Sequence, residues 1–112
     1  MNPEIEKFLY DIWDASVEID LFLKNISFRK FMNNKLLQAA IERKFEIIGE
    51  ALNRIKRIDS EFIENFKEHH RIIGFRNIIA HGYDVIDQEM VWAAVKKHLP
   101  LLKQEVSEFI KV

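Results

Sequence analysis

The chain has 112 residues and a net charge of −1, and its mix of 48% hydrophobic and 31% charged residues is that of a folded domain and excludes bulk disorder. It has no cysteine, which excludes disulfides and thiolate metal sites, and its net charge excludes a globally basic surface for nucleic acid. Three Gly and two Pro are too few for the many turns of an all-β fold. Because no apolar run approaches membrane-spanning length and the N-terminus lacks a signal-peptide pattern, we expect one cytoplasmic domain over residues 1–112.

Two helices are predicted in the first half of the chain. Asn2 is a typical N-cap for a helix over residues 3–24, along which apolar side chains recur at helical spacing. Ser27 is a suitable N-cap for a second helix that extends to about Arg57, with a weak point at Asn33-Asn34. The apolar residues of this second helix cover about half of its circumference, which is wider than one core-facing stripe. It therefore contacts several neighbours or lies at a dimer interface.

The second half of the chain begins with a short predicted helix and continues with a longer one. Ser60 is suited to cap the short helix, over residues 60–69. The next helix begins near Arg71 and should stop at Gly82, because glycine commonly follows the last residue of a helix.

The last predicted helix covers residues 88–111, with Asp87 as its N-cap. Pro100 lies inside this stretch and lacks the amide hydrogen that a continuous helix needs, so it should bend or break the helix there. The chain as a whole is predicted to be all-α, an up-and-down four-helix bundle with an additional short helix.

The most informative polar residues, Arg76, Asn77, His81 and Tyr83, lie within eight residues. On a continuous helix, residues four apart lie about 40° apart around the axis, so the Asn77 amide can hold the imidazole of His81 in one tautomer. Arg76 and His81 are five apart and diverge by about 140°. Either the His81 side chain swings round at the end of the helix, or a second subunit supplies the other half of the site.

These residue types suit cleavage of RNA by its own 2′-hydroxyl group. His81 can act as general base or acid near neutral pH, and the Arg76 guanidinium can stabilise negative charge that develops on the phosphate. No paired carboxylates or histidine cluster with metal-binding spacing accompany them, so we expect neither a metal nor a cofactor.

Three parts of the sequence stand out together: Gly74–Tyr83, Glu46–Ala51, and the downstream pairs Val91-Trp92 and Leu99-Pro100. They resemble the HEPN-domain proteins and, more narrowly, the HepT-like toxin family. Their order and spacing both fit, and the resemblance covers about residues 36–106.

The resemblance implies a HEPN-type bundle that forms a homodimer, with two copies of the motif lining one cleft. It implies a metal-independent endoribonuclease that is the toxin of a type VII-like toxin–antitoxin pair, with a minimal nucleotidyltransferase as antitoxin. In the family this antitoxin transfers AMP onto the tyrosine of the motif, here Tyr83. Carried over to this chain, Arg76 and His81 are catalytic, Asn77 orients His81, and RNA is the substrate.

Glu50 follows Gly49 inside the second predicted helix, where a glycine is costly unless something approaches closely. One interpretation is a solvated ion-pair ladder with neighbouring arginines such as Arg54. The other is that Glu50 approaches the motif and positions Arg76 or His81.

The remaining histidines receive no functional role. Adjacent residues of a helix point about 100° apart, so His69 and His70 are poorly placed to chelate a metal together and are predicted to lie at the surface. His98 is predicted to be a partly buried bundle residue.

Two other functions remain open. The chain could be a non-catalytic helical subunit that presents substrate to a nucleotidyltransferase partner, which the slightly acidic charge favours. It could also be only an oligomerisation element, although the polar motif has no packing purpose. The intact Arg76 and His81 pair favours the nuclease.

Overall fold

A computed structural model describes residues 1–82 and 86–111, and those parts contain six α-helices and one 3-10 turn. The elements in chain order are α1 (Pro3–Phe22), α2 (Phe28–Met32), α3 (Lys35–Ile58), η1 (Phe62–Asn65), α4 (His69–His81), α5 (Gln88–Lys97) and α6 (Leu99–Ser107). The predicted all-α class is confirmed. No described helix is both long enough and apolar enough to cross a membrane.

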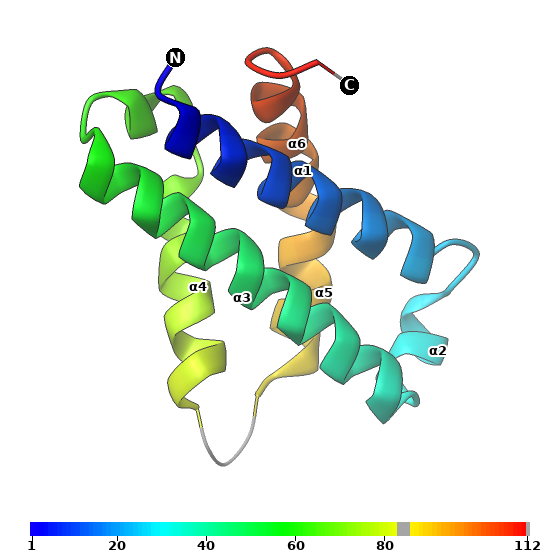
Figure 1. The fold of residues 1–112 in the computed structure, drawn as a ribbon. Coiled ribbons are helices and arrows are strands. Elements are labelled where there is room, and N and C mark those ends of the chain that lie inside the picture. Colours follow the sequence, from blue (N-terminus) through cyan, green and yellow to red (C-terminus); the bar gives the residue numbers. More distant parts are fainter. Residues whose placement is uncertain (83–85, 112) are drawn as a thin grey trace.

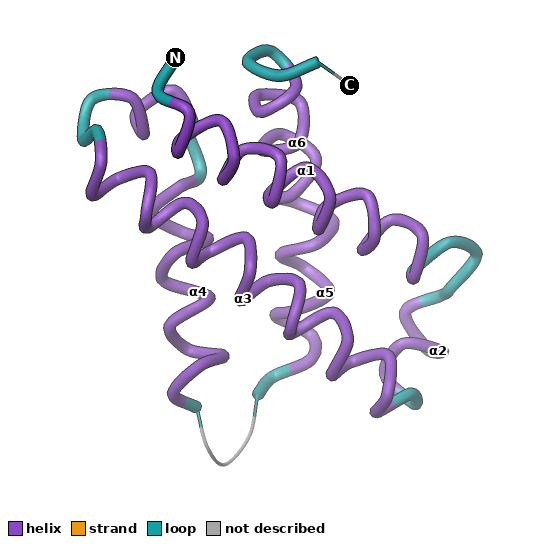
Figure 2. The backbone as a smooth tube through the Cα atoms, viewed as in Figure 1, coloured by secondary structure: helices purple, strands orange, loops and turns teal. Residues whose placement is uncertain are grey.

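The elements form four long segments that run up and down (Figure 1). α1 and α3 run antiparallel and pack closely, and α4 packs across the other side of α3. α5 and α6 follow one another along the fourth segment, and α6 returns to pack against α1. The tube in Figure 2 shows α2 within the connection from α1 to α3. The two chain ends lie at the same end of the bundle (Figure 1).

Side-chain caps set most helix starts, as the sequence predicts. The side chains of Asn2, Ser27 and Asp87 accept hydrogen bonds from backbone N–H groups in the first turns of α1, α2 and α5. α1 ends at Phe22, slightly earlier than predicted. The predicted weak point becomes a full break, because the Asn34 side chain accepts from the Leu37 N–H at 2.9 Å and starts α3.

The predicted helix over residues 60–69 is wrong in length and in its cap. Only Phe62–Asn65 forms a 3-10 turn, and the Asp59 carboxylate, not Ser60, accepts from the backbone N–H groups of residues 61 and 62. Asp59 is the capping residue in place of Ser60 because it directly follows α3 and its side chain reaches both amides. α4 consequently begins at His69, before the predicted start near Arg71.

The break expected at Pro100 is confirmed. α5 ends at Lys97 and α6 begins at Leu99, so Pro100 lies in the first turn of a new helix. A proline is tolerated there because the amides of a first turn have no partner within the helix.

The wide apolar arc of the second predicted helix is explained by its neighbours. α3 contacts α1, α4, α2, η1 and α5, so several of its sides are covered within one chain. Its fully buried side chains are Ile41, Phe45, Ile48, Leu52 and Ile55. Of the two explanations that the sequence left open, the structure supports contact with several neighbours.

Candidate active site

The motif lies at the C-terminal end of α4. The helix is regular through His81 and ends at Gly82, whose N–H donates to the carbonyl of Ile78 at 2.7 Å. A Cβ atom on Gly82 would lie 2.6 Å from that same oxygen. The predicted stop is confirmed, and glycine is needed there because the backbone turns in closely.

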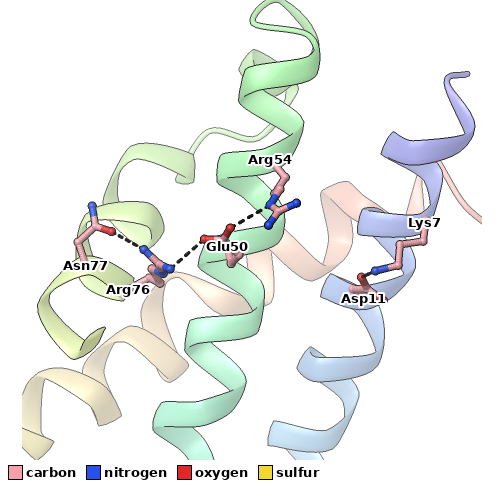
Figure 3. Close-up of polar contacts among 6 residues, drawn as sticks. All are labelled: Lys7, Asp11, Glu50, Arg54, Arg76 and Asn77. Carbon is pink, nitrogen blue, oxygen red and sulfur yellow. Dashed lines mark hydrogen bonds and ion pairs between the residues drawn. The ribbon is translucent and has the colours of Figure 1, made fainter. Parts of the chain in front are cut away.

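The Arg76 guanidinium is held by two neighbours, as Figure 3 shows. One terminal nitrogen lies 2.9 Å from Glu50 Oε2 on α3, and the other donates to Asn77 Oδ1 at 3.0 Å. The second oxygen of Glu50 pairs with Arg54 at 3.0 Å. Because a guanidinium has five N–H donors, these contacts fix its plane and leave donors for a further anion.

Gly49 allows Arg76 to lie where it does. A Cβ atom at position 49 would overlap the Cβ of Arg76 and lie 2.6 Å from its Cγ. The expectation of a close helix crossing at this glycine is therefore confirmed. α4 passes so near to α3 that the stem of Arg76 occupies the space of a side chain at position 49.

Both contacts considered for Glu50 exist at once. It pairs with Arg54 along α3, as a surface ladder would, and it also reaches Arg76 on α4. Its carboxylate therefore approaches the motif, as the second of the two interpretations expected. That this contact serves catalysis stays a prediction.

Arg76 forms part of the wall of a cavity of about 370 Å³ between α1, α3 and α4. The charged residues that line it are Lys7, Asp11, Arg43, Glu46, Glu50, Arg54 and Arg76. Each acid has a basic partner; Lys7 and Asp11, for instance, pair at 2.7 Å (Figure 3). The cavity thus has four basic and three acidic groups and can accept a phosphate whose charge competes with the carboxylates.

His81 is exposed at the end of α4, and no hydrogen bond or ion pair holds it within the described parts of the chain. The expected hydrogen bond between Asn77 and His81 is not found among the described residues. The Asn77 carboxamide oxygen accepts from Arg76 instead. The guanidinium is a charged donor, and hydrogen bonds to charged groups are the stronger ones. Asn77 therefore orients Arg76 in the single chain.

Arg76 and His81 do not converge within one chain. Arg76 points towards α3 and contacts Glu50, whereas His81 extends from the exposed last turn of α4. Since the helix is regular to its end, the two side chains leave it about 140° apart. Of the two geometries that the sequence left open, the regular helix through His81 favours the one in which a second subunit supplies the other half of the site.

An apolar groove lies beside the motif, between α4 and α5. It has a volume of about 430 Å³ and is lined by apolar side chains that include Phe45, Phe75, Ile78 and Met90. Ile78 is 52% exposed and Met90 49% exposed, so both of these apolar side chains in the groove are open to solvent.

Two aspects of the site lie beyond the sequence predictions. Tyr83 is outside the described residues, so the structure does not place it. Lys7 and Asp11 were not predicted to line the cavity, because on α1 they follow an ordinary solvated i, i+4 pattern. Only the packing of α1 on α3 brings them beside Arg54.

A comparison with protein families matches residues 12–109 to the model of the family described as ribonuclease HepT-like. The chain belongs to this family. The resemblance seen in the motif segments is thereby confirmed for the HepT-like fold and family. No solved structure matches this HepT-like chain.

Named relatives of this HepT-like chain cover nearly its whole length. "Putative RNase MJ1380" of Methanocaldococcus jannaschii is 37% identical over 92% of this chain and 94% of its own. "Putative RNase MJ1216" of the same organism is 36% identical over 96% of this chain and 88% of its own. "Probable ribonuclease HepT" of Thermococcus cleftensis is 32% identical over 99% of this chain and 100% of its own.

Proposed function

We propose that this chain is a metal-independent endoribonuclease that acts as the toxin of a toxin–antitoxin pair. The observation that carries the proposal is the fixed Arg76 guanidinium, held by Glu50 and Asn77 on the wall of a cavity in a HepT-like fold. A guanidinium held in this way is suited to bind a phosphodiester and to stabilise added negative charge without reorganising.

The reaction is attack by the 2′-hydroxyl oxygen on the adjacent phosphorus. The new P–O2′ bond forms as the P–O5′ bond breaks, which gives a 2′,3′-cyclic phosphate and a 5′-hydroxyl. His81 removes the proton from the 2′-hydroxyl or delivers one to the departing 5′-oxygen, and Arg76 stabilises the charge on the phosphorane-like transition state. The exposure of His81 leaves its imidazole accessible to RNA.

The complete site is formed by a homodimer in this proposal. The divergence of Arg76 and His81 on one α4 supports it, because a second copy can bring its own motif to the same phosphate. The exposed Ile78 and Met90 beside the motif supply an apolar surface for such a contact.

Cleavage is tested with purified wild type, His81→Ala and Arg76→Ala on RNA in the presence of EDTA. Wild type should release fragments with 2′,3′-cyclic phosphate ends, and both variants should lose activity by on the order of 100-fold or more. Arg29→Ala is the control, since Arg29 is exposed on α2 and lines neither the cavity nor the groove; this variant should cleave RNA as wild type does. Activity abolished by EDTA, or unchanged in His81→Ala, would contradict the proposal.

Growth distinguishes the nuclease from the alternative function. Wild type expressed without the partner gene should stop growth and degrade RNA, and His81→Ala should be harmless. Equal harmlessness of both would favour the non-catalytic substrate-binding subunit. The three acidic side chains in the cavity are the observation that favours this alternative, because they oppose RNA.

A minimal nucleotidyltransferase is the proposed antitoxin, and Tyr83 is the proposed modification site. The Tyr83 hydroxyl oxygen attacks the α-phosphorus of ATP, pyrophosphate leaves and the phenolic proton is lost. The added phosphate places negative charge near His81, only two residues away, and repels RNA.

Intact-mass measurement after incubation with the partner and ATP tests this modification. Wild type should gain one or more adenylyl groups and lose nuclease activity, and Tyr83→Phe should gain none. Tyr10→Phe is the control, because Tyr10 is the other tyrosine and its hydroxyl already contacts the Lys111 carbonyl near the end of the chain. Modification that persists in Tyr83→Phe would contradict the assignment.

A further inference from the structure

A second polar cluster lies at the opposite end of α4 from the motif. One potential ligand atom from each of Glu64, His69 and His70 lies within 4.8 Å of the others. Glu64 Oε1 is 3.5 Å from His69 Nε2, and the two imidazole rings have centroids 3.9 Å apart. The prediction that adjacent histidines would diverge and lie at the surface is wrong for His69, because their side chains lean together at the start of α4.

The cluster combines one rigid group with two adjustable ones. His69 is only 2% exposed, at the first position of α4, whereas Glu64 and His70 are exposed. An ion can therefore enter from solvent and meet an imidazole that is already fixed. The two exposed side chains can then complete its coordination without moving the backbone.

The two ring nitrogens of His69 have different surroundings. Glu64 Oε1 faces Nε2, so Nε2 is the nitrogen that can meet an ion beside Glu64, whereas Nδ1 is buried without a hydrogen-bond partner among the described residues. Burial, and then the neighbouring His70, lower the pKa of His69 below its ordinary value. The neutral imidazole is thus favoured, and this is the form that binds a metal.

We propose that Glu64, His69 and His70 bind one Zn²⁺ ion. Two imidazole nitrogens and one carboxylate oxygen are ligands that Zn²⁺ accepts in proteins, and water can fill a fourth position. Magnesium and calcium prefer sites made of oxygen ligands, so the two histidines favour a first-row transition metal. Nothing in this assignment rests on the proposed nuclease activity.

The ion has a structural role in this proposal. Glu64 belongs to η1 and the two histidines to the start of α4, so the ion joins two elements that a short turn connects. His81 is twelve residues further along the helix, about 18 Å away at 1.5 Å per residue. The zinc site is therefore separate from the RNA site and leaves the proposed metal-independent cleavage unaffected.

The test uses the full chain, stripped with EDTA, freed of chelator and titrated with Zn²⁺ by calorimetry. Wild type should bind one ion per chain, and its Tm should rise on binding. Cobalt(II) should give visible absorption bands typical of a low-coordinate site. Glu64→Gln and His70→Ala, which change exposed side chains, should each bind zinc at least about tenfold more weakly. His69→Ala is avoided because it empties a buried position.

Three matched variants make the result specific. Glu61→Gln changes a nearby exposed carboxylate, and His98→Ala and His81→Ala remove other histidines; all three should bind zinc as wild type does. Absence of one-to-one binding would overturn the proposal. So would affinity unchanged in both Glu64→Gln and His70→Ala, or lost in His81→Ala.

Discussion

Gly49 and Arg76 occupy one space at the crossing of α3 and α4. The stem of Arg76 lies where a side chain at position 49 would be, and its Cγ would be 2.6 Å from a Cβ there. Because the overlapping atoms are near the backbone, the arginine cannot avoid a larger residue by rotating its end. The position of the guanidinium therefore depends on residue 49 being a glycine, which has no Cβ atom.

Gly49→Ala should displace Arg76 and destabilise the fold. Alanine gains up to about 1 kcal/mol of helix propensity, but overpacking of a tight contact costs about 1–3 kcal/mol. We expect a net loss of about 1 kcal/mol in the free energy of unfolding, measured by urea titration, together with slower RNA cleavage.

Gly74→Ala is the matched control for that change. Gly74 is an exposed α4 residue, and a Cβ atom there meets nothing within 4 Å. This variant should be more stable than wild type by about 0.5–1 kcal/mol. If both alanines stabilise the chain alike, the close crossing at Gly49 is wrong.

Glu50→Gln should impair cleavage while leaving the fold nearly intact. The substitution removes the charge that holds the Arg76 guanidinium, and a small displacement of a catalytic group can cost on the order of 10-fold or more in rate. Stability should change by less than about 1 kcal/mol, as for other partly exposed pairs. The measurement is the single-turnover rate of cleavage beside a urea titration.

Glu46→Gln is the comparison for Glu50→Gln. The Glu46 side chain has the same exposed fraction, 35%, and pairs with Arg43 rather than with the motif. Its cleavage rate should equal that of wild type. Equal losses in both variants would mean that Glu50 acts only through the general charge of the cavity.

Ile78→Glu should convert the proposed dimer to monomers and abolish cleavage. A carboxylate in an apolar contact is costly to bury, and Ile78 lies beside the motif in the groove between α4 and α5. Sedimentation velocity measures the assembly. Leu36→Glu is the control, since Leu36 is 84% exposed on another part of the surface. A dimer that survives Ile78→Glu but dissociates in Leu36→Glu would place the interface elsewhere.

The helices and their limits could largely be predicted from local chemistry. Asn2, Ser27 and Asp87 cap helices because their short side chains reach the amides that follow them, and Pro100 interrupts because it lacks an amide hydrogen. The cap of η1 could not be predicted in this way. Both Asp59 and Ser60 can cap, and only the path of the chain after α3 decides between them.

The contacts of the candidate site were harder to predict. Asn77 is one helical turn before His81, yet its carboxamide contacts Arg76, because α3 places Glu50 where it draws the guanidinium to that side. His69 is buried by the turn that precedes α4, which its polar neighbours in the sequence do not reveal. Both outcomes depend on packing between helices and not on spacing along one helix.

Stability should fall as the pH is lowered below about 6.5 in metal-free buffer. Burial is the main reason that the pKa of His69 is lowered, with His70 and Lys56 adding to it and Glu64 opposing it. Below about pH 6.5, His69 binds a proton more readily in the unfolded chain than in the folded chain. The contribution of His69 to stability is therefore complete above its unfolded pKa and is lost as the pH falls towards its lower pKa in the folded chain. Tm measured from pH 8 to pH 5 should show this fall, and the slope should be smaller in His69→Gln.

The central claim is that Arg76 of one protomer and His81 of the other act on the same phosphate. The direct measurement is the cleavage rate of mixed dimers formed from Arg76→Ala and His81→Ala chains, each inactive alone. A shared site leaves one intact pair in every mixed dimer, so random mixing should restore about a quarter of the wild-type rate. If mixed dimers form and the rate stays at that of the parent variants, the two groups do not meet across an interface and the account is wrong.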